Sequence, residues 1–462
     1  MPLLTRRAMM QGLLAQTLWA RPSTAQTVAH RSPTPLAPGA VTHDWSSFLG
    51  PSHNAVSTET HLRRMFPPPL VWEFQTGSGY ASPAIVRNWL VFVHRVGDEE
   101  IVECLHAKTG ASQWRFRYPT AYEDRYGYNN GPRSSPVVEG NRVFSIGAEG
   151  KFHALDLETG EMLWRRDFRT EYGSTQDFFG VSSSPLVERD VVIVNVGGTE
   201  EACVVGFDTT TGRERWRAGN WGPSYASPVP ATIHGQRRVF VFAGGESSPP
   251  EGGLLSIDPV TGRVDFSVSH RSRTYESVNA ACPVVFGDKI FISASYRAGG
   301  TLVQVQPDFS HRMVWSTQEF ALHFNTPIYR DGLLFGFDGR NQGDASLACI
   351  DVETGRIVWR EVPTWTETFN QNGRTRESIL GTARGSLLAV DGQFLCLGEF
   401  GHLLWMDLTD KGYVEVARTW LFAARESWTL PVLSQGLLYV KQNTRDLTTG
   451  AEPRLLCYDL RG

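Results

Sequence analysis

The sequence predicts an all-β protein, an eight-bladed β-propeller of four-stranded antiparallel blades, on the basis of three observations. A phrase of the form Asp, Thr-Gly, Trp recurs along the chain, and a proline that starts an apolar strand recurs ahead of it. The two ends of the chain also supply complementary parts of one repeat unit. Self-similarity at a period of tens of residues indicates repeated supersecondary blocks, so the repeats define the architecture before any single residue is considered.

The repeated phrase occurs in three clear copies: DLETGEMLW (156–164), DTTTGRERW (208–216) and DVETGRIVW (351–359). Diverged copies end at Trp114 and Phe266, and in DLTDKGYVEV the Trp position falls on Val416. Glycine in the turn supplies a positive φ, Asp or Thr beside it bonds the local backbone, and Trp on an outer strand buries about 150–250 Å² between blades. We therefore interpret one set of repeat residues as structural: Trp72, Gly110, Trp114, Gly160, Trp164, Gly212, Trp216, Gly262, Phe266, Trp315, Gly355 and Trp359.

A small residue followed by proline and an apolar strand marks the start of each unit: Pro83, Pro136, Pro185, Pro228, Pro283, Pro327 and Pro431. The gap from Pro327 to Pro431 is twice the others, and the missing unit lies at GSLLAVDG, with Leu387 in place of proline. Eight units with a mean period of about 50 residues result. Each contains four strands separated by turns, as expected of a propeller blade.

The two ends of the chain predict how the ring closes. The last unit stops at CYDLRG without a fourth strand, whereas LVWEFQTG ahead of the first unit is a strand without a blade. Trp72 in that strand lies 11 residues before Pro83, close to the 12-residue spacing of Trp216 and Pro228. We therefore expect the N-terminal strand to complete the C-terminal blade, which removes both open edges. The propeller is assigned to residues 68–462.

Residues 1–25 have the features of a signal peptide. Arg6 and Arg7 precede a weakly apolar stretch, and Ser23-Thr24-Ala25 offers small residues for cleavage. The paired arginines resemble a twin-arginine signal, with an ordinary secretory signal as the alternative. Residues 26–67 are predicted to form a leader or linker, flexible to about residue 42 because it is rich in Pro, Ser and Thr. We expect an exported, periplasmic or extracytoplasmic protein without a lipid anchor, since no cysteine follows the signal peptide.

Composition argues against several classes of protein. A net charge of −4 over 462 residues and the lack of basic runs give no indication of nucleic-acid binding. No apolar run reaches the roughly 18 residues of a transmembrane helix. The six cysteines are widely spaced and the twelve histidines lack metal-binding spacing, so no metal site is predicted. Buried free thiols and a monomeric protein are expected.

The repeats and their Ser-Pro strand starts resemble the pyrroloquinoline-quinone (PQQ) enzyme repeat over about residues 71–462. That family includes quinoprotein alcohol dehydrogenases and non-catalytic BamB-like propellers of outer-membrane protein assembly, and DWSSFLGPSHNAVS (44–57) resembles a leader of exported bacterial propellers. Resemblance to the catalytic members implies PQQ and Ca²⁺ in a central funnel, a Trp floor, a vicinal disulfide and a catalytic Asp. This chain has no adjacent cysteines and no CxxCH haem site, which argues against an enzyme of that kind. The repeat specifies fold rather than function.

The proline landmark also predicts which residues border the central channel. In a propeller the chain between an outer strand and the next inner strand crosses one face, so the residue three before each landmark should face the channel. These positions, the channel ring, are Tyr80, Arg133, Ser182, Tyr225, Ala280, Phe324, Arg384 and Trp428. Beside them stand Asn279, His323 and Asn325. Long loops are expected on the same face at 118–132, 169–181 and 362–382, the last with Trp365, Arg374, Arg376 and Glu377.

Two interpretations of the channel ring stay open. Arginines among stacking aromatics suit a planar anion or a polar chain such as a glycan or peptide. Alternatively, Arg133 and Arg384 pair with Asp124, Glu123 or Glu377 and line a wet channel. The sequence predicts an exported binding or scaffolding module for a protein, glycan or small polar ligand, with no catalytic residue and no cofactor assigned. The alternatives are a divergent PQQ-dependent oxidoreductase that also uses Ca²⁺, and a BamB-like function in outer-membrane protein assembly.

Overall fold

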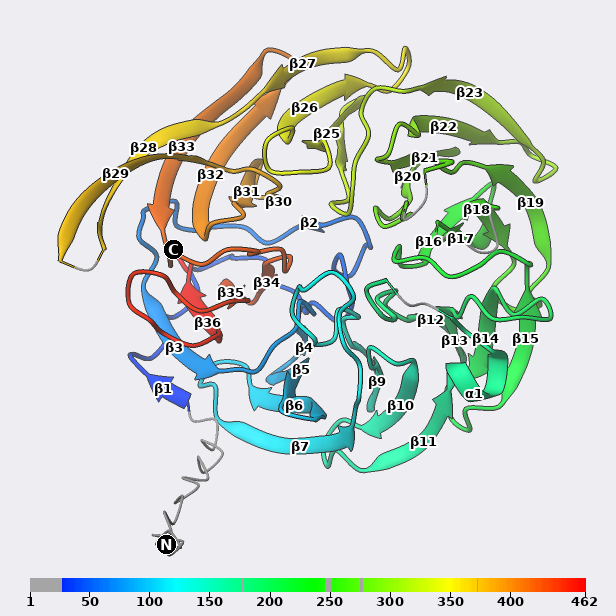
Figure 1. Cartoon of the computed structure of the whole chain (residues 1–462), viewed down its shortest axis with the longest axis horizontal. Coiled ribbons are helices and arrows are strands. Elements are labelled where there is room, and N and C mark those ends of the chain that lie inside the picture. The colour runs from blue at the N-terminus through cyan, green and yellow to red at the C-terminus, as the bar shows by residue number, and fades with distance from the viewer. Residues whose placement is uncertain (1–26, 176–177, 246–250, 275–276, 372) are drawn as a thin grey trace, which may run out of the picture.

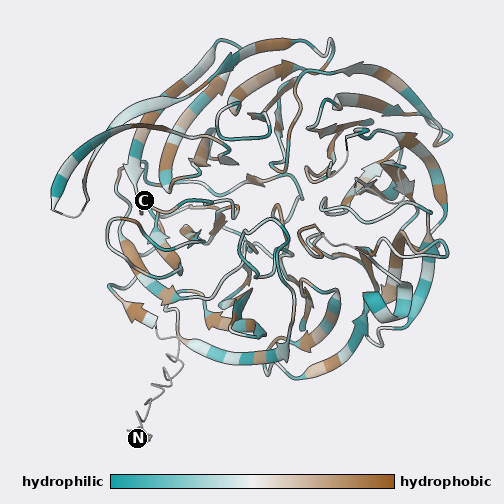
Figure 2. Cartoon of the chain, viewed as in Figure 1, coloured by the Kyte–Doolittle hydropathy of each residue, from teal (hydrophilic) through white to brown (hydrophobic). Residues whose placement is uncertain are grey.

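The chain forms a closed ring of eight antiparallel blades, as the repeats predict (Figure 1). The computed structural model describes residues 27–175, 178–245, 251–274, 277–371 and 373–462, and the predicted signal peptide lies outside them. Each blade runs from a short inner strand beside the central axis to a long outer strand at the rim. Apolar residues concentrate within the blades (Figure 2), where they build the contacts between neighbouring sheets.

From inner to outer strand, the first four blades are β4 (Ala84–Val86), β5 (Trp89–Val96), β6 (Glu99–His106), β7 (Ser112–Pro119); β8 (Val137–Glu139), β9 (Arg142–Ile146), β10 (Lys151–Asp156), β11 (Met162–Asp167); β12 (Leu186–Glu188), β13 (Val191–Asn195), β14 (Val204–Asp208), β15 (Glu214–Ala218); and β16 (Val229–Ile233), β17 (Gln236–Gly244), β18 (Gly252–Ile257), β19 (Val264–Ser269). A short helix, α1 (Phe168–Tyr172), follows β11 and is capped by the Asp167 side chain.

The remaining blades are β20 (Val284–Phe286), β21 (Lys289–Ala294), β22 (Gly299–Val305), β23 (His311–Thr317); β24 (Ile328–Arg330), β25 (Leu333–Asp338), β26 (Ser346–Asp351), β27 (Ile357–Glu361); β30 (Ser386–Val390), β31 (Gln393–Leu397), β32 (His402–Thr409), β33 (Gly412–Trp420); and β34 (Val432–Ser434), β35 (Leu437–Gln442), β36 (Arg454–Asp459) with β3 (Leu70–Gln75). In the last blade β3 pairs antiparallel with β36, and Trp72 lies opposite Cys457. The prediction that the N-terminal strand completes the C-terminal blade is confirmed.

The repeated Trp and Gly meet at the contact between neighbouring blades, here called a seam. The indole N–H of Trp164 donates to Thr209 O of the next blade at 3.1 Å. Gly212 of that blade lies on the same ring: it has φ +66°, and a Cβ there would stand 2.5 Å from the Trp164 ring. Corresponding N–H bonds join Trp72, Trp114, Trp216, Trp315 and Trp359 to the following blade. The structural interpretation of the repeat is thereby confirmed.

The seventh blade departs from this pattern by exchanging two side chains. Elsewhere a small or apolar residue of the third strand faces the Trp, as Cys104 faces Trp114. Here the third strand carries Trp405, which is fully buried, and the outer strand carries Ala417 opposite it. The assignment of the Trp position to Val416 is therefore wrong by one residue. Val416 lies at the register shift between Glu415, which pairs with Met406, and Ala417, which pairs with Trp405. The tight turn between Thr409 and Gly412 also changes the number of residues between the Asp of the repeat and this position.

The landmark proline marks a belt of hydrogen bonds around the channel. The residue before five of the seven landmark prolines accepts a backbone N–H of the preceding blade with its hydroxyl or thiol: Ser82 N donates to Ser135 Oγ at 2.9 Å, and Ser135 N donates to Ser184 Oγ at 3.0 Å. The belt continues through Ser227, Cys282 and Thr326. Because the inner strands converge there, these bonds join neighbouring blades where their side chains are smallest.

Residues 27–67 lie against the propeller, although the sequence suggested a flexible leader to about residue 42. Strand β1 (Thr27–Ala29) adds a fifth strand to the last blade, and β2 (Val56–Ser57) pairs parallel with β30. Between them Trp45 is fully buried and exchanges two backbone hydrogen bonds with Ile85, at 2.7 and 2.8 Å. The segment between β1 and β2 crosses the ring (Figure 1). Packing of its few large apolar residues outweighs its loop-like composition.

Residues 362–382 form a hairpin, β28 (Thr364–Gln371) and β29 (Arg374–Gly381), that projects beyond the rim of the ring (Figure 1). The prediction that this segment is a crossing loop at the channel is wrong. Trp365 packs edge-on against His402 at 4.8 Å, and the Arg418 guanidinium lies 4.2 Å from the Trp365 ring centre. These contacts hold the base of the hairpin against the seventh blade and direct it away from the axis.

Candidate functional site: the central cavity

All eight positions of the channel ring line one cavity of about 200 Å³ on the axis of the propeller. They converge because each stands at the same place in its repeat, three residues before an inner strand. His323 and Asn325 also line the cavity, whereas Asn279 does not. Asn279 is buried behind the wall, where its side-chain amide donates to Ala243 O at 3.1 Å and its backbone carbonyl accepts from Tyr225 N at 2.9 Å. It therefore serves to hold the loop.

The leader supplies part of the cavity wall, through Phe48, Leu49 and Ala55. Leu49 and Ala55 have φ +64° and +55°, an uncommon backbone for residues with side chains, and Ala55 N donates to Leu49 O at 2.9 Å. The surrounding leader contacts the inner strands themselves, since Ala389 N, in β30, donates to Ala55 O at 2.9 Å. The leader thus closes the channel opposite the face of the crossing loops.

Both arginines of the channel ring are held by buried carboxylates. Arg133 Nη2 donates to Asp124 Oδ2 at 2.6 Å, and Arg384 Nε donates to Glu399 Oε2 at 3.1 Å while its Nη2 bonds the other oxygen. The Asp124 and Glu399 side chains have no exposed surface. Of the partners considered from the sequence, Asp124 is correct, whereas Glu123 and Glu377 are not the partners. No repeat position or motif pointed to Glu399, which lies in the connection between β31 and β32 of the seventh blade.

Aromatic rings surround Trp428 on one side of the cavity. Its ring centre lies 5.3 Å from that of Tyr80, 5.4 Å from Tyr128 and 5.6 Å from Phe324. The Arg384 guanidinium stacks 4.7 Å from the Trp428 centre, and on the other side Arg133 lies 5.2 Å from Tyr80. The Trp428 indole N–H is buried without a hydrogen-bond partner in the parts of the chain that the structure describes. It is a donor that the protein leaves unused.

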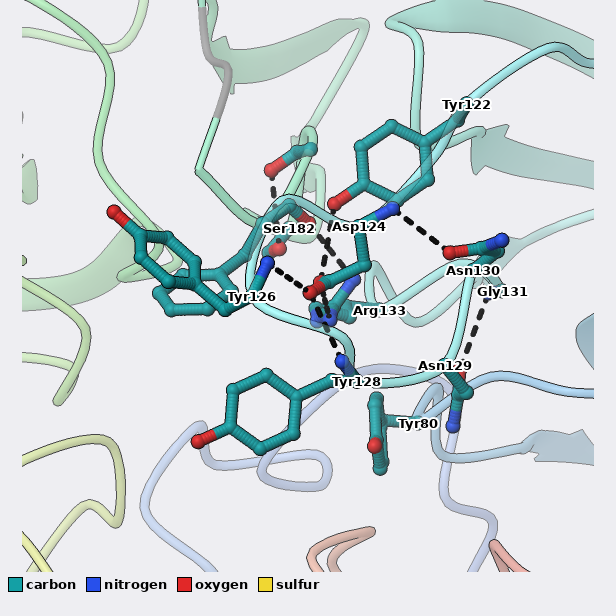
Figure 3. A network of polar contacts seen from close by, with 12 residues as sticks. Tyr80, Tyr122, Asp124, Tyr126, Tyr128, Asn129, Asn130, Gly131, Arg133 and Ser182 are labelled. Atoms are coloured by element: carbon teal, nitrogen blue, oxygen red, sulfur yellow. Dashed lines mark hydrogen bonds and ion pairs between the residues drawn. The ribbon is translucent and has the colours of Figure 1, made fainter.

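The loop of residues 120–132 folds over the centre of the ring around one carboxylate (Figures 1 and 3). Asp124 Oδ1 accepts the backbone N–H groups of Tyr126 and Tyr128 at 2.9 and 3.1 Å, and its other oxygen binds Arg133. Asp124 N in turn donates to Asn130 Oδ1 at 2.8 Å. This network places Tyr128 against Trp428, as the prediction of a long loop at this face requires. The second predicted loop contributes Phe179 to the wall.

Burial shifts the titration of two groups in the wall. It lowers the pKa of His323 to about 3, with a further contribution from Arg384, so the imidazole is neutral at physiological pH. Burial, followed by the Glu426 carboxylate, raises the pKa of Tyr80, whose hydroxyl donates to Glu426. Three guanidiniums, those of Arg133, Arg384 and Arg340, the last acting on His323, therefore stand around the cavity with three carboxylates: Asp124, Glu399 and Glu426. Sequence reasoning missed Glu426 because it belongs to no repeat position.

Fold and repeat together define a PQQ-repeat propeller. A family model described as outer membrane protein assembly factor BamB matches residues 98–361, which is more than half of the chain. The chain therefore belongs to this BamB-like family of PQQ-repeat propellers.

Known proteins similar to the chain include both a BamB and a quinoprotein. BamB of Yersinia pestis is 23% identical over 279 residues, which are 58% of this chain and 65% of that protein. Quinohemoprotein alcohol dehydrogenase ADH-IIG of Pseudomonas putida is 25% identical over 142 residues, 30% of this chain and 19% of that protein. The chain thus spans less than two thirds of either relative.

Solved structures support the fold alone. BamB from Moraxella catarrhalis superposes with a TM-score of 0.53 at 13% identity, covering 85% of this chain and 97% of that one. A europium-containing methanol dehydrogenase superposes with a TM-score of 0.61 at 13% identity, covering 90% and 98%. No helix within the described residues is long and apolar enough to cross a membrane.

The described wall of the cavity lacks the ligands that the Ca²⁺ of catalytic propellers requires. Calcium takes about 6–8 oxygen ligands, mainly carboxylates, yet the described wall contains no Asp or Glu. Asp124 and Glu399 lie behind it and are bound by arginine. No group of three or more His, Cys, Asp or Glu suited to a metal occurs in the described ranges. The six cysteines are free, buried and not adjacent. Calorimetric titration with PQQ and Ca²⁺ is expected to give no binding heat; saturable binding would contradict this.

Proposed function

We propose that this protein is an exported propeller that binds a small polar ligand or a partner segment at the loop-rich mouth of its central cavity, without catalysing a reaction. Export rests on the predicted signal peptide. The binding function rests on one observation: eight equivalent positions of the repeat converge on a single cavity, which the leader closes on the opposite side. A concave site lined by aromatic residues with a few fixed polar groups is typical of ligand pockets.

The pairing of the titratable groups supports binding rather than chemistry. The carboxylates nearest the cavity are engaged with Arg133, Arg384 and the Tyr80 hydroxyl. Each guanidinium is held by a fixed partner, which orients its remaining N–H donors at little entropic cost. Such a pre-organised wall favours affinity, because less side-chain freedom is lost when a ligand enters.

Thermal-shift measurements test this function. The wild type, Trp428→Ala and a control, Met162→Ala, are mixed with a panel of amino acids, short peptides, sugars and uronates of all charges. Met162 is 46% exposed on the outer strand β11, far from the cavity. A ligand at one hundred times its Kd stabilises the folded state by about 2.7 kcal/mol. We expect at least one compound to raise the Tm of wild type and control but not of Trp428→Ala; a panel in which no compound separates the two variants overturns the proposal.

Membership of the BamB family favours a second candidate, participation in outer-membrane protein assembly. Under this hypothesis the mouth of the cavity or the projecting β28–β29 hairpin would contact a partner protein. Affinity purification of the tagged chain from solubilised envelopes is expected to recover an outer-membrane β-barrel protein in stoichiometric amount. Recovery of equal amounts with an unrelated tagged periplasmic protein would remove this candidate.

A further inference from the structure

The central cavity carries two guanidiniums but no excess of positive charge. Arg133 is paired with Asp124 and Arg384 with Glu399, and neither carboxylate has exposed surface. Glu426, bound to the Tyr80 hydroxyl, adds a third negative charge. His323 contributes no charge at neutral pH because its pKa is lowered to about 3. An anionic ligand would therefore meet two arginines already neutralised, in a region of low dielectric where an added unpaired charge is costly.

The same wall is well supplied with neutral hydrogen-bonding groups. A hydroxyl provides one donor and two acceptor sites. Ser184 Oγ and Thr326 Oγ1, both in the wall, each accept one backbone N–H, at 3.0 Å in both cases. Within the described parts of the chain Ser184 Oγ makes no second bond, so its hydroxyl proton and second acceptor site stay available to a ligand, whereas the Thr326 hydroxyl also bonds the Cys282 thiol. A guanidinium has five N–H donors, and bonds from Nε, Nη1 and Nη2 account for three of those of Arg384.

The size and the apolar part of the cavity restrict the ligand further. A volume of about 200 Å³ is somewhat larger than the roughly 150 Å³ of a protein cavity that holds one benzene molecule. That space suits a single saturated ring rather than a chain of rings. Trp428, Phe324 and Tyr80 offer ring faces on which an apolar side of the ligand can pack.

From charge, hydroxyl groups and volume together, we infer that the cavity binds an uncharged, hydroxylated ring of single-sugar size and discriminates against the corresponding carboxylate. This inference rests on the proposed binding function and adds the chemical class of the ligand. The discriminating element is the pair of buried carboxylates that hold Arg133 and Arg384, because they remove the attraction that two free guanidiniums would exert on an anion.

Three matched pairs of probes test the inference by calorimetric titration of the full-length mature protein: glucose and glucuronate, galactose and galacturonate, mannose and mannuronate. The members of each pair differ in charge and not in ring size. We expect the uncharged member of at least one pair to bind at least tenfold more tightly than its uronate. Tighter binding of the uronate in every pair, or no binding of any uncharged member, overturns the inference. In the latter case the proposed function stands if the wider panel contains a ligand, so the two failures are distinguishable.

Two isosteric variants, Asp124→Asn and Glu399→Gln, test the cause of the discrimination. Each releases one guanidinium from its carboxylate and is expected to shift the preference toward the uronate by about tenfold. Met162→Ala serves as the matched surface control and leaves the preference unchanged. Circular dichroism and the melting temperature establish that each variant is folded before titration. A folded Asp124→Asn protein and a folded Glu399→Gln protein that both keep the wild-type preference would contradict the proposed basis of selectivity.

Discussion

The seams and the channel ring are both built from eight copies of one backbone unit, yet the seams repeat the same side chain whereas the ring varies it. Six seams carry a Trp whose N–H bonds a carbonyl of the next blade. The eight ring positions, by contrast, carry six residue types, from Ala280 to Trp428. The contact between blades requires a side chain of one shape, so the sequence repeats Trp there. The ring positions are placed by the backbone, so their side chains are free to diverge. The comparison indicates that stability resides mainly at the seams and that specificity resides at the ring.

Removal of a seam Trp should give the largest effect. Trp164→Ala deletes a buried ring and its hydrogen bond to Thr209 O, and large-to-small changes of this kind cost about 3–5 kcal/mol. Met162→Ala, two residues earlier on the same strand and largely exposed, should change the free energy of unfolding by less than about 0.5 kcal/mol. Chemical denaturation measures both. Equal losses in the free energy of unfolding for the two variants would show that the seam Trp does not stabilise the protein more than an exposed residue of the same strand.

The seam between the last and first blades contains a buried amine, which tests whether seams need apolar side chains. Lys441 stands in β35 where the other blades place residues such as Val93, Ile146 and Phe242. Burial lowers its pKa from 10.5 to about 7. The unfolded chain therefore binds more protons than the folded protein between about pH 7 and pH 10.5. As a result, the free energy of unfolding rises with pH across this window and is lowered by the buried ammonium below it.

Lys441→Met should stabilise the protein by about 3 kcal/mol at pH 6, because it removes a buried charge. It should also flatten the rise of stability between pH 7 and pH 10. Denaturation midpoints at pH 6 and pH 9.5 provide the measurement, and Lys289→Met, at a partly exposed site, is the control. A variant less stable than wild type at pH 6 would mean that the ammonium makes favourable contacts.

The ion pair of Arg384 and Glu399 tests the ring side of the comparison. Glu399→Gln leaves the guanidinium without its charged partner and should cost about 2 kcal/mol. The double variant Arg384→Met with Glu399→Gln should recover most of that loss, since no unpaired charge remains. A double-mutant cycle by chemical denaturation measures the coupling. Strictly additive losses would show that the two side chains act independently.

Two serines separated by one residue should give the smallest and most discriminating effect. Ser184 Oγ accepts Ser135 N in the belt between blades, so Ser184→Ala should cost about 1 kcal/mol. Ser182 belongs to the channel ring and its hydroxyl makes a long bond of 3.3 Å to Gly180 O, so Ser182→Ala should fall within about 0.5 kcal/mol of wild type. Melting temperatures of the two variants provide the measurement. A larger loss for Ser182→Ala than for Ser184→Ala would contradict the assignment of stability to the belt rather than to the channel ring.

The number of blades, the closure of the ring and the location of the channel ring could be predicted, because a repeated backbone places corresponding residues at corresponding sites. The part of the cavity wall that the leader supplies could not be predicted, since Ala55 contacts Ala389, far along the chain, and neither Leu49 nor Ala55 belongs to a repeat. Glu399 was missed for the same reason. Ala417 was missed because a register shift and a tight turn moved the Trp position by one residue. Counting along a sequence succeeds where spacing is fixed and fails where strands slip.

The pairing of β3 with β36 also has a kinetic consequence. Trp72 and Cys457 are opposite one another although 385 positions separate them in the chain. In thermodynamic terms so long a closure is inexpensive, since each doubling of loop length costs only about 0.6 kcal/mol. The pairing nevertheless forms slowly, because contacts between residues distant in the chain form after local ones. The strand Leu70–Gln75 is synthesised early, yet the edge that pairs with β36 must stay open until the last blade exists. We therefore expect ring closure to be the final folding step and the stage most prone to aggregation.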